Sequence, residues 1–164
     1  MRKSLLLFLI VICLPIRSLT QVLDSVSINI FDSLLIKAQA MMTQKDFSSA
    51  LIKLSEAEKL LLEKNGVETV QFGDVRFLQG RVAYLKRDFP QAEANYNDSK
   101  KIREKLLGKM HPEYTKCIMS IGVMYYVQGK FMQAEPYFLE GKLNYEKTVG
   151  TENLDYAKCM NNLA

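Results

Sequence analysis

The sequence repeats itself without a gap at a period of about 42 residues, and this period constrains the fold more than any other feature. Three phenylalanines, three alanines and three larger apolar residues align at this spacing: Phe47, Phe89 and Phe131; Ala50, Ala92 and Ala134; Leu54, Tyr96 and Phe138. A column of small residues consists of Ala38, Gly80, Gly122 and Ala164. Self-similarity at a period of roughly 20 to 50 residues is typical of solenoids. The period predicts three complete units and the start of a fourth.

Each unit is predicted to be a helical hairpin, because its apolar residues recur at helical spacing. In the third unit one stripe consists of Ile118, Ile121, Gly122 and Tyr125. A second stripe consists of Phe131, Ala134, Phe138 and Gly141, after a Gln-Gly-Lys turn at 128–130. Two helices that cross closely leave no room for a large side chain, which explains the small residues in the Gly122 and Ala134 columns.

Signals for helix ends recur in the same register. Glycines stand at 66, 108 and 150, where left-handed backbone geometry can close a helix. Three residues later come Thr69, His111 and Asn153, which we expect at helix N-caps, with Pro112 in a first turn. The predicted helices cover residues 27–45, 47–64, 70–87, 89–107, 112–128, 131–148 and 154 onward. The predicted fold class is all-α, a right-handed superhelical solenoid of helix-turn-helix repeats.

The small, aromatic and alanine columns resemble the tetratricopeptide repeat, with Gly122 and Tyr125 on the first helix and Ala134, Phe138 and Gly141 on the second. The usual unit is about 34 residues long. The longer unit of this chain resembles the kinesin-light-chain variety, as do the stretches 107–112 (Leu-Gly-Lys-Met-His-Pro) and 161–164 (Asn-Asn-Leu-Ala). HEAT and armadillo repeats have similar lengths but fit the small-residue columns and the glycines between units less well.

The resemblance divides the chain into repeats at 27–66, 69–108 and 111–150, with a truncated first helix of a fourth repeat at 153–164. Because that helix lacks its partner, we expect the sequence to be the N-terminal part of a longer protein. Similar exported bacterial proteins continue into a caspase-like CHAT domain or a sensor histidine kinase. The first repeat departs from the pattern at Ala38 and Leu54, as expected of a terminal unit.

Residues 1–20 have the layout of a secretory signal peptide: a basic start, an apolar run of ten residues, a proline and small residues. The run is shorter than the roughly 20 residues that span a bilayer, so we expect cleavage near Thr20. An uncleaved anchor is the alternative. The signal predicts a periplasmic or extracellular location, with a bacterial origin.

The net charge of +4 does not indicate a nucleic-acid partner. Removing Arg2, Lys3 and Arg17 of the leading segment from the 22 basic residues leaves 19 against 18 acidic ones. A nearly neutral body lacks the basic patch that phosphate binding requires.

We predict no catalytic site, no metal site and no cofactor. The single histidine, His111, stands at a helix start without a nearby partner, whereas catalysis requires supported acid-base pairs. Cys117 and Cys159 occupy equivalent places and are interpreted as packing residues, since a zinc site requires more ligands at close spacing.

The predicted function is therefore a scaffold that binds peptide segments of other proteins on the concave surface lined by the first helices. Helical projection gives these candidate groove residues: Arg81, Tyr84, Lys116, Met119, Val123, Tyr126, Lys158 and Asn161. Lysine and arginine pair with carboxylates and tyrosine supplies contact area, so the expected ligand is acidic with an aromatic or aliphatic anchor. The alternatives are a regulatory arm of a larger enzyme, a binder of small ligands or glycans, and side chains that only pack between helices.

Overall fold

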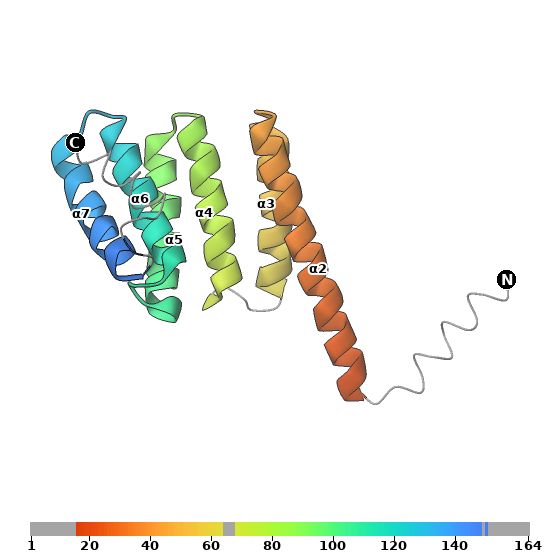
Figure 1. The fold of residues 1–164 in the computed structure, drawn as a ribbon. Helices are drawn as coiled ribbons and strands as arrows, with labels where there is room; N and C mark the ends of the chain where they lie inside the picture. The colour runs from red at the N-terminus through yellow and green to blue at the C-terminus, as the bar shows by residue number, and fades with distance from the viewer. Residues whose placement is uncertain (1–15, 64–67, 149, 151–164) are drawn as a thin grey trace.

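Three helical hairpins stand side by side in a single row (Figure 1). The computed structural model describes residues 16–63, 68–148 and 150, with side chains from residue 25 onward. The hairpins pair α2 (Ile16–Thr43) with α3 (Phe47–Glu63), α4 (Val70–Leu85) with α5 (Phe89–Leu107), and α6 (Pro112–Tyr126) with α7 (Phe131–Thr148). Helix α3 packs against α4, and α5 against α6. The described residues contain no strand, and the predicted all-α solenoid is confirmed.

The predicted helix boundaries agree with the structure to within two residues at every described end except one. Helix α2 begins at Ile16 instead of 27, because the sequence from Ile16 to Thr43 contains neither glycine nor proline that would interrupt a helix. It therefore includes the last residues of the segment assigned to the signal peptide, 16–20. The fourth-repeat helix at 153–164 lies outside the described residues. No helix in the described ranges is long and apolar enough to cross a membrane.

Two of the predicted N-cap residues, Thr69 and His111, cap the helices α4 and α6. The Thr69 hydroxyl accepts a hydrogen bond from the backbone N–H of Phe72 at 3.2 Å, and His111 Nδ1 accepts one from that of Glu113 at 3.2 Å. Gly108 and Gly150 have φ values of 85° and 80°, so the expected left-handed geometry is confirmed at these two positions. Gly66 and Asn153, the remaining members of the two columns, lie outside the described residues.

An additional left-handed column lies inside the hairpins, where the first helix turns into the second. Lys45, Arg87 and Gly129 occupy equivalent positions of the three repeats and have φ values of 60°, 61° and 72°. The hairpin geometry therefore imposes this conformation on two side chains that disfavour it. Only the third hairpin has a glycine, Gly129, which adopts the left-handed conformation without steric cost.

Arg87→Gly is expected to raise the free energy of unfolding by about 1 kcal/mol, because the left-handed conformation costs a residue with a Cβ roughly that much. Lys86→Gly is the matched control, since Lys86 has a φ of −80° and gains nothing from glycine. Urea denaturation followed by circular dichroism measures both variants. Equal effects of the two substitutions would contradict this explanation.

The small-residue column allows an aromatic ring of the second helix to lie directly on the backbone of the first. A Cβ added at Gly80 would come within 2.7 Å of the Tyr96 ring, and one at Gly122 within 2.7 Å of the Phe138 ring. Tyr96 and Phe138 are both buried. The first hairpin has Ala38 and Leu54, both fully buried, at the equivalent positions. In the first hairpin, therefore, the first helix can carry the Cβ of Ala38, because the second helix has Leu54 there instead of an aromatic ring.

Gly122→Ala is expected to destabilise the protein by about 1 to 3 kcal/mol, because the methyl group displaces the Phe138 ring from a packed core. The double variant Gly122→Ala/Phe138→Leu reproduces the Ala38 and Leu54 pair of the first hairpin. We expect it to be more stable than the sum of the two single effects predicts, which a double-mutant cycle of denaturation midpoints measures. Strictly additive effects would show that the two positions do not constrain each other.

Candidate functional site

Five of the eight predicted groove residues line one groove between α4 and α6. Helix α4 contributes Arg81 and Tyr84, and α6 contributes Lys116, Met119 and Val123. The groove has a volume of about 430 Å³. Its remaining lining residues are Phe77, Leu85, Tyr96, Ser120 and Tyr145. Successive hairpins therefore supply the two walls of the groove.

The other three predicted residues are not part of this lining. Tyr126 lies at the end of α6, 47% exposed, with its ring 5.3 Å from that of Phe131 and 6.3 Å from that of Phe138. Its equivalent Tyr84 lines the groove because the helix of the following hairpin lies beside it. The described residues include no helix at that place next to Tyr126, and its predicted position in the groove stays a prediction. Lys158 and Asn161 lie outside the described residues.

The groove residues come together because the concave surface is built in layers, each formed by equivalent positions of successive repeats. Leu35, Phe77 and Met119 form an apolar layer across α2, α4 and α6. A second hollow of about 390 Å³ lies beside Leu35, and Phe77 and Lys116 line both hollows. These two side chains thus mark the boundary between the two parts of the concave surface.

Two cations lie over the Phe77 ring. The Arg103 guanidinium carbon is 4.9 Å and the Lys116 ammonium nitrogen 5.1 Å from the ring centroid. A cation over an aromatic face is attracted by the electrons of the ring. Lys116 nonetheless remains exposed, and so does Arg81 on the opposite wall of the groove. The Lys116 ammonium nitrogen also lies 3.6 Å from Glu113 Oε2 in a partly exposed ion pair, and both Lys116 and Arg81 remain accessible to a ligand.

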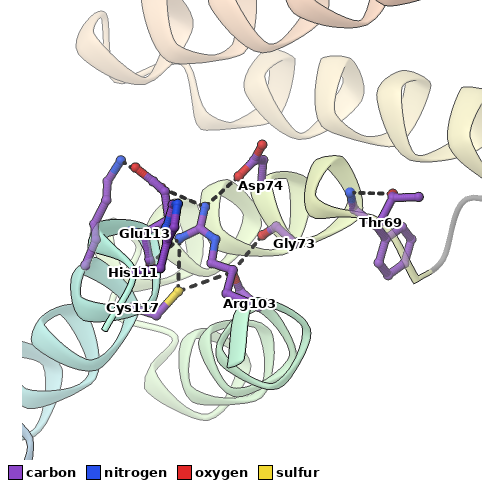
Figure 2. A network of polar contacts seen from close by, with 10 residues as sticks. Thr69, Gly73, Asp74, Arg103, His111, Glu113 and Cys117 are labelled. Carbon is purple, nitrogen blue, oxygen red and sulfur yellow. Dashed lines mark hydrogen bonds and ion pairs between the residues drawn. The ribbon is translucent and has the colours of Figure 1, made fainter. Parts of the chain in front are cut away.

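Arg103, on α5, joins three helices at the junction between the second and third hairpins (Figure 2). Its Nη2 lies 2.6 Å from Asp74 Oδ1 on α4 and 3.0 Å from Glu113 Oε2 on α6. Its Nη1 donates to the Glu113 carbonyl at 2.9 Å and to Cys117 Sγ at 3.1 Å. The residue is 1% exposed, so a full positive charge is buried and compensated at this junction.

A chain of neutral hydrogen bonds continues from the Arg103 site across the same junction. The Cys117 thiol donates to Ser99 Oγ at 3.3 Å, and that hydroxyl donates to the Gly73 carbonyl at 2.7 Å. Burial raises the pKa of the Cys117 thiol, although Arg103 and Ser99 act in the opposite direction. The thiol is therefore protonated at neutral pH and can act as this donor. Its role as a buried packing residue agrees with the sequence interpretation.

Burial also raises the pKa of the Asp74 carboxyl, and the hydrogen bond from Arg103 opposes this effect. Asp74 therefore depends on Arg103 to remain ionised in its half-buried position. Among the described residues, no three histidine, cysteine or acidic side chains are grouped as metal binding would require.

The sequence does indicate that Arg103 has a special role, although the helical projection that gave the candidate groove residues did not use this indication. The equivalent positions of the preceding and following repeats are Leu61 and Tyr145, so Arg103 is a charged residue in an otherwise apolar column. A charge at such a position requires partners, which Asp74 and Glu113 provide. The identity of the partners could not be predicted, because a column aligns equivalent positions of different repeats and does not show which side chains of neighbouring helices meet.

Comparison with known proteins supports the fold. No family model and no curated protein matches the chain. A solved structure that matches is that of BtubC (BKLC) from P. vanneervenii, with a TM-score of 0.74 and 16% sequence identity, covering 81% of this chain and 53% of that one. The chain has a tetratricopeptide-like repeat fold. It spans about half the length of BtubC, and at this identity the similarity concerns the fold alone.

Arg103→Leu, which introduces the residue found at the equivalent position 61, is expected to destabilise the protein by about 3 kcal/mol, because Asp74 loses its buried counter-charge. Arg103→Leu/Asp74→Asn should recover a substantial part of this loss. Lys105→Leu is the control, since its ion pair with Glu68 is exposed at both ends and should contribute nothing measurable. Guanidinium denaturation measures all three variants. An Arg103→Leu protein as stable as the control would show that the junction does not depend on this charge.

Proposed function

We propose that the chain binds peptide segments of other proteins in the groove between α4 and α6. The observation that supports this function is that Arg81, Tyr84, Lys116, Met119 and Val123 line one groove. The groove is open along one side and combines apolar surface with two exposed cations. An extended or helical segment can enter such a surface without any rearrangement of the hairpins.

The lining residues define the chemistry of the peptide. Tyr84, Met119 and Val123 are half-buried, so each offers apolar surface against which an aromatic or aliphatic anchor can pack. Arg81 and Lys116 stand on opposite walls of the groove and can each pair with a carboxylate. The expected ligand is therefore an acidic segment with one large apolar side chain.

The signal-like leader suggests that binding takes place outside the cytoplasm, as in exported bacterial repeat proteins. In such proteins the repeats serve as the recognition arm of a larger chain that carries a CHAT-type protease-like or histidine kinase domain. Regulation of an enzyme is thus an alternative role for the same groove. Sequencing the gene downstream of the codon for Ala164 distinguishes a scaffold from a regulatory arm.

A small-ligand or glycan binder is the second candidate, supported by the aromatic residues Phe77, Tyr84 and Tyr145 in the lining and by the groove volume. That volume lies within the roughly 300 to 1,000 Å³ that is common for ligand pockets. The two cations favour a peptide over an uncharged glycan, because neither of them is needed for stacking on a sugar ring.

Selection of a phage-displayed random peptide library on the immobilised chain is expected to enrich acidic peptides that contain an aromatic or aliphatic residue. Fluorescence polarisation with an enriched, labelled peptide measures its affinity. Arg81→Glu should weaken binding by about tenfold or more, since an attractive charge becomes repulsive. Lys101→Glu makes the same change on an exposed residue of α5 outside the groove and should leave the affinity unchanged.

A second groove variant tests the apolar contact. Met119→Lys adds charge at a half-buried lining position, and we expect it to reduce binding of the same peptide. The proposal is wrong if the library yields no enriched peptide, or if the enriched peptide binds both groove variants as it binds the control.

A further inference from the structure

Helix α7 has an apolar stripe on its outer surface that neither of the other hairpins repeats. Met132 is 90% exposed, Leu139 50% and Leu143 47%, and Pro136 is exposed between them. The spacings of four, three and four residues place all four side chains on one face of the helix. This pattern is that of a helix seam that packs against a second helix.

Stacking of a further hairpin does not explain this stripe. The equivalent positions of the preceding repeat, on α5, are Pro90, Ala94, Asn97 and Lys101. Three of them are exposed and Asn97 is half-buried, although α6 packs against α5. A hairpin that followed α7 in the same manner would therefore leave Met132, Leu139 and Leu143 open to solvent. The stripe is a surface additional to the stacking face.

The charges beside the stripe indicate what covers it. Glu135 and Lys142 are seven residues apart, so they lie on the same edge of the seam, one near each end. When two copies of α7 run antiparallel about a twofold axis between Tyr137 and Phe138, Glu135 of each copy and Lys142 of the other flank the same edge of the seam. They are offset by two residues, or roughly 3 Å of helix rise, which their long side chains can bridge. The same register places Met132 beside Leu143 and Pro136 beside Leu139 across the axis. One register thus satisfies both the charges and the apolar side chains.

We propose that the α7 stripe is a self-complementary interface through which two copies of this chain pair antiparallel in solution. A twofold interface uses the same patch on both copies, as this arrangement requires. Lys142 already lies 3.7 Å from Glu146 in its own helix, with both side chains about one-third exposed, and in the dimer it pairs with Glu135 as well. The groove between α4 and α6 is on a different surface, so pairing does not depend on the proposed peptide binding.

Sedimentation velocity of the full chain, over a concentration series in the micromolar range, is the experiment. We expect a reversible monomer–dimer equilibrium. Leu139→Lys should weaken the dimer by about tenfold or more, because a charge enters the apolar seam of both copies. Ile52→Lys is the matched control, since Ile52 is 57% exposed on α3 and its replacement should leave the equilibrium unchanged.

Charge reversal tests the antiparallel register directly. Glu135→Lys and Lys142→Glu should each weaken the dimer by placing like charges opposite each other, and the double reversal should restore it. Circular dichroism verifies that each variant retains its helical content. A chain that remains monomeric throughout the series overturns the proposal. A dimer that is insensitive to Leu139→Lys and to both single reversals overturns it as well, because another surface then forms the contact.

Discussion

The contact between an aromatic ring on one helix and the bare backbone of its partner sets the spacing on which the rest of the solenoid depends. Where Tyr96 lies on Gly80 and Phe138 on Gly122, the two helices approach as closely as the ring thickness allows. This approach places the first helices α4 and α6 where both can line the groove. The two walls of the groove are therefore in register, because the second and third hairpins, which supply them, are closed by the same kind of contact.

The junctions between hairpins are chemically less uniform than the hairpins themselves. Between the first and second hairpins, Arg76 and Gln79 both hydrogen-bond to Glu58, at 2.6 and 2.8 Å. Between the second and third, the buried Arg103 bridges α4 and α6, and the Tyr125 hydroxyl donates to Glu93. The groove spans this second junction, so its width depends on a buried charge that does not line it.

The sequence predicted the backbone well because a repeat presents every structural signal several times. The helix ends, the caps at Thr69 and His111 and the glycine at 108 all follow from aligned columns. Five of the predicted residues line one groove, because the residues on one face of a helix can be projected once the helix register is known. What occurs only once in the chain was not predicted: the long start of α2, the partners of Arg103 and the stripe on α7.

The Arg103 junction also fixes the order of the hairpins. Its partner Glu113 and the acceptor Cys117 belong to the third hairpin, whereas the second contributes Asp74 and Arg103 itself. The backbones of the three units are nearly equivalent, but a permuted chain in which the second hairpin came last would bury the guanidinium with only one of its three partner residues, Asp74. Genetic shuffling of these units would therefore be limited by one arginine, even though the helices themselves would still stack.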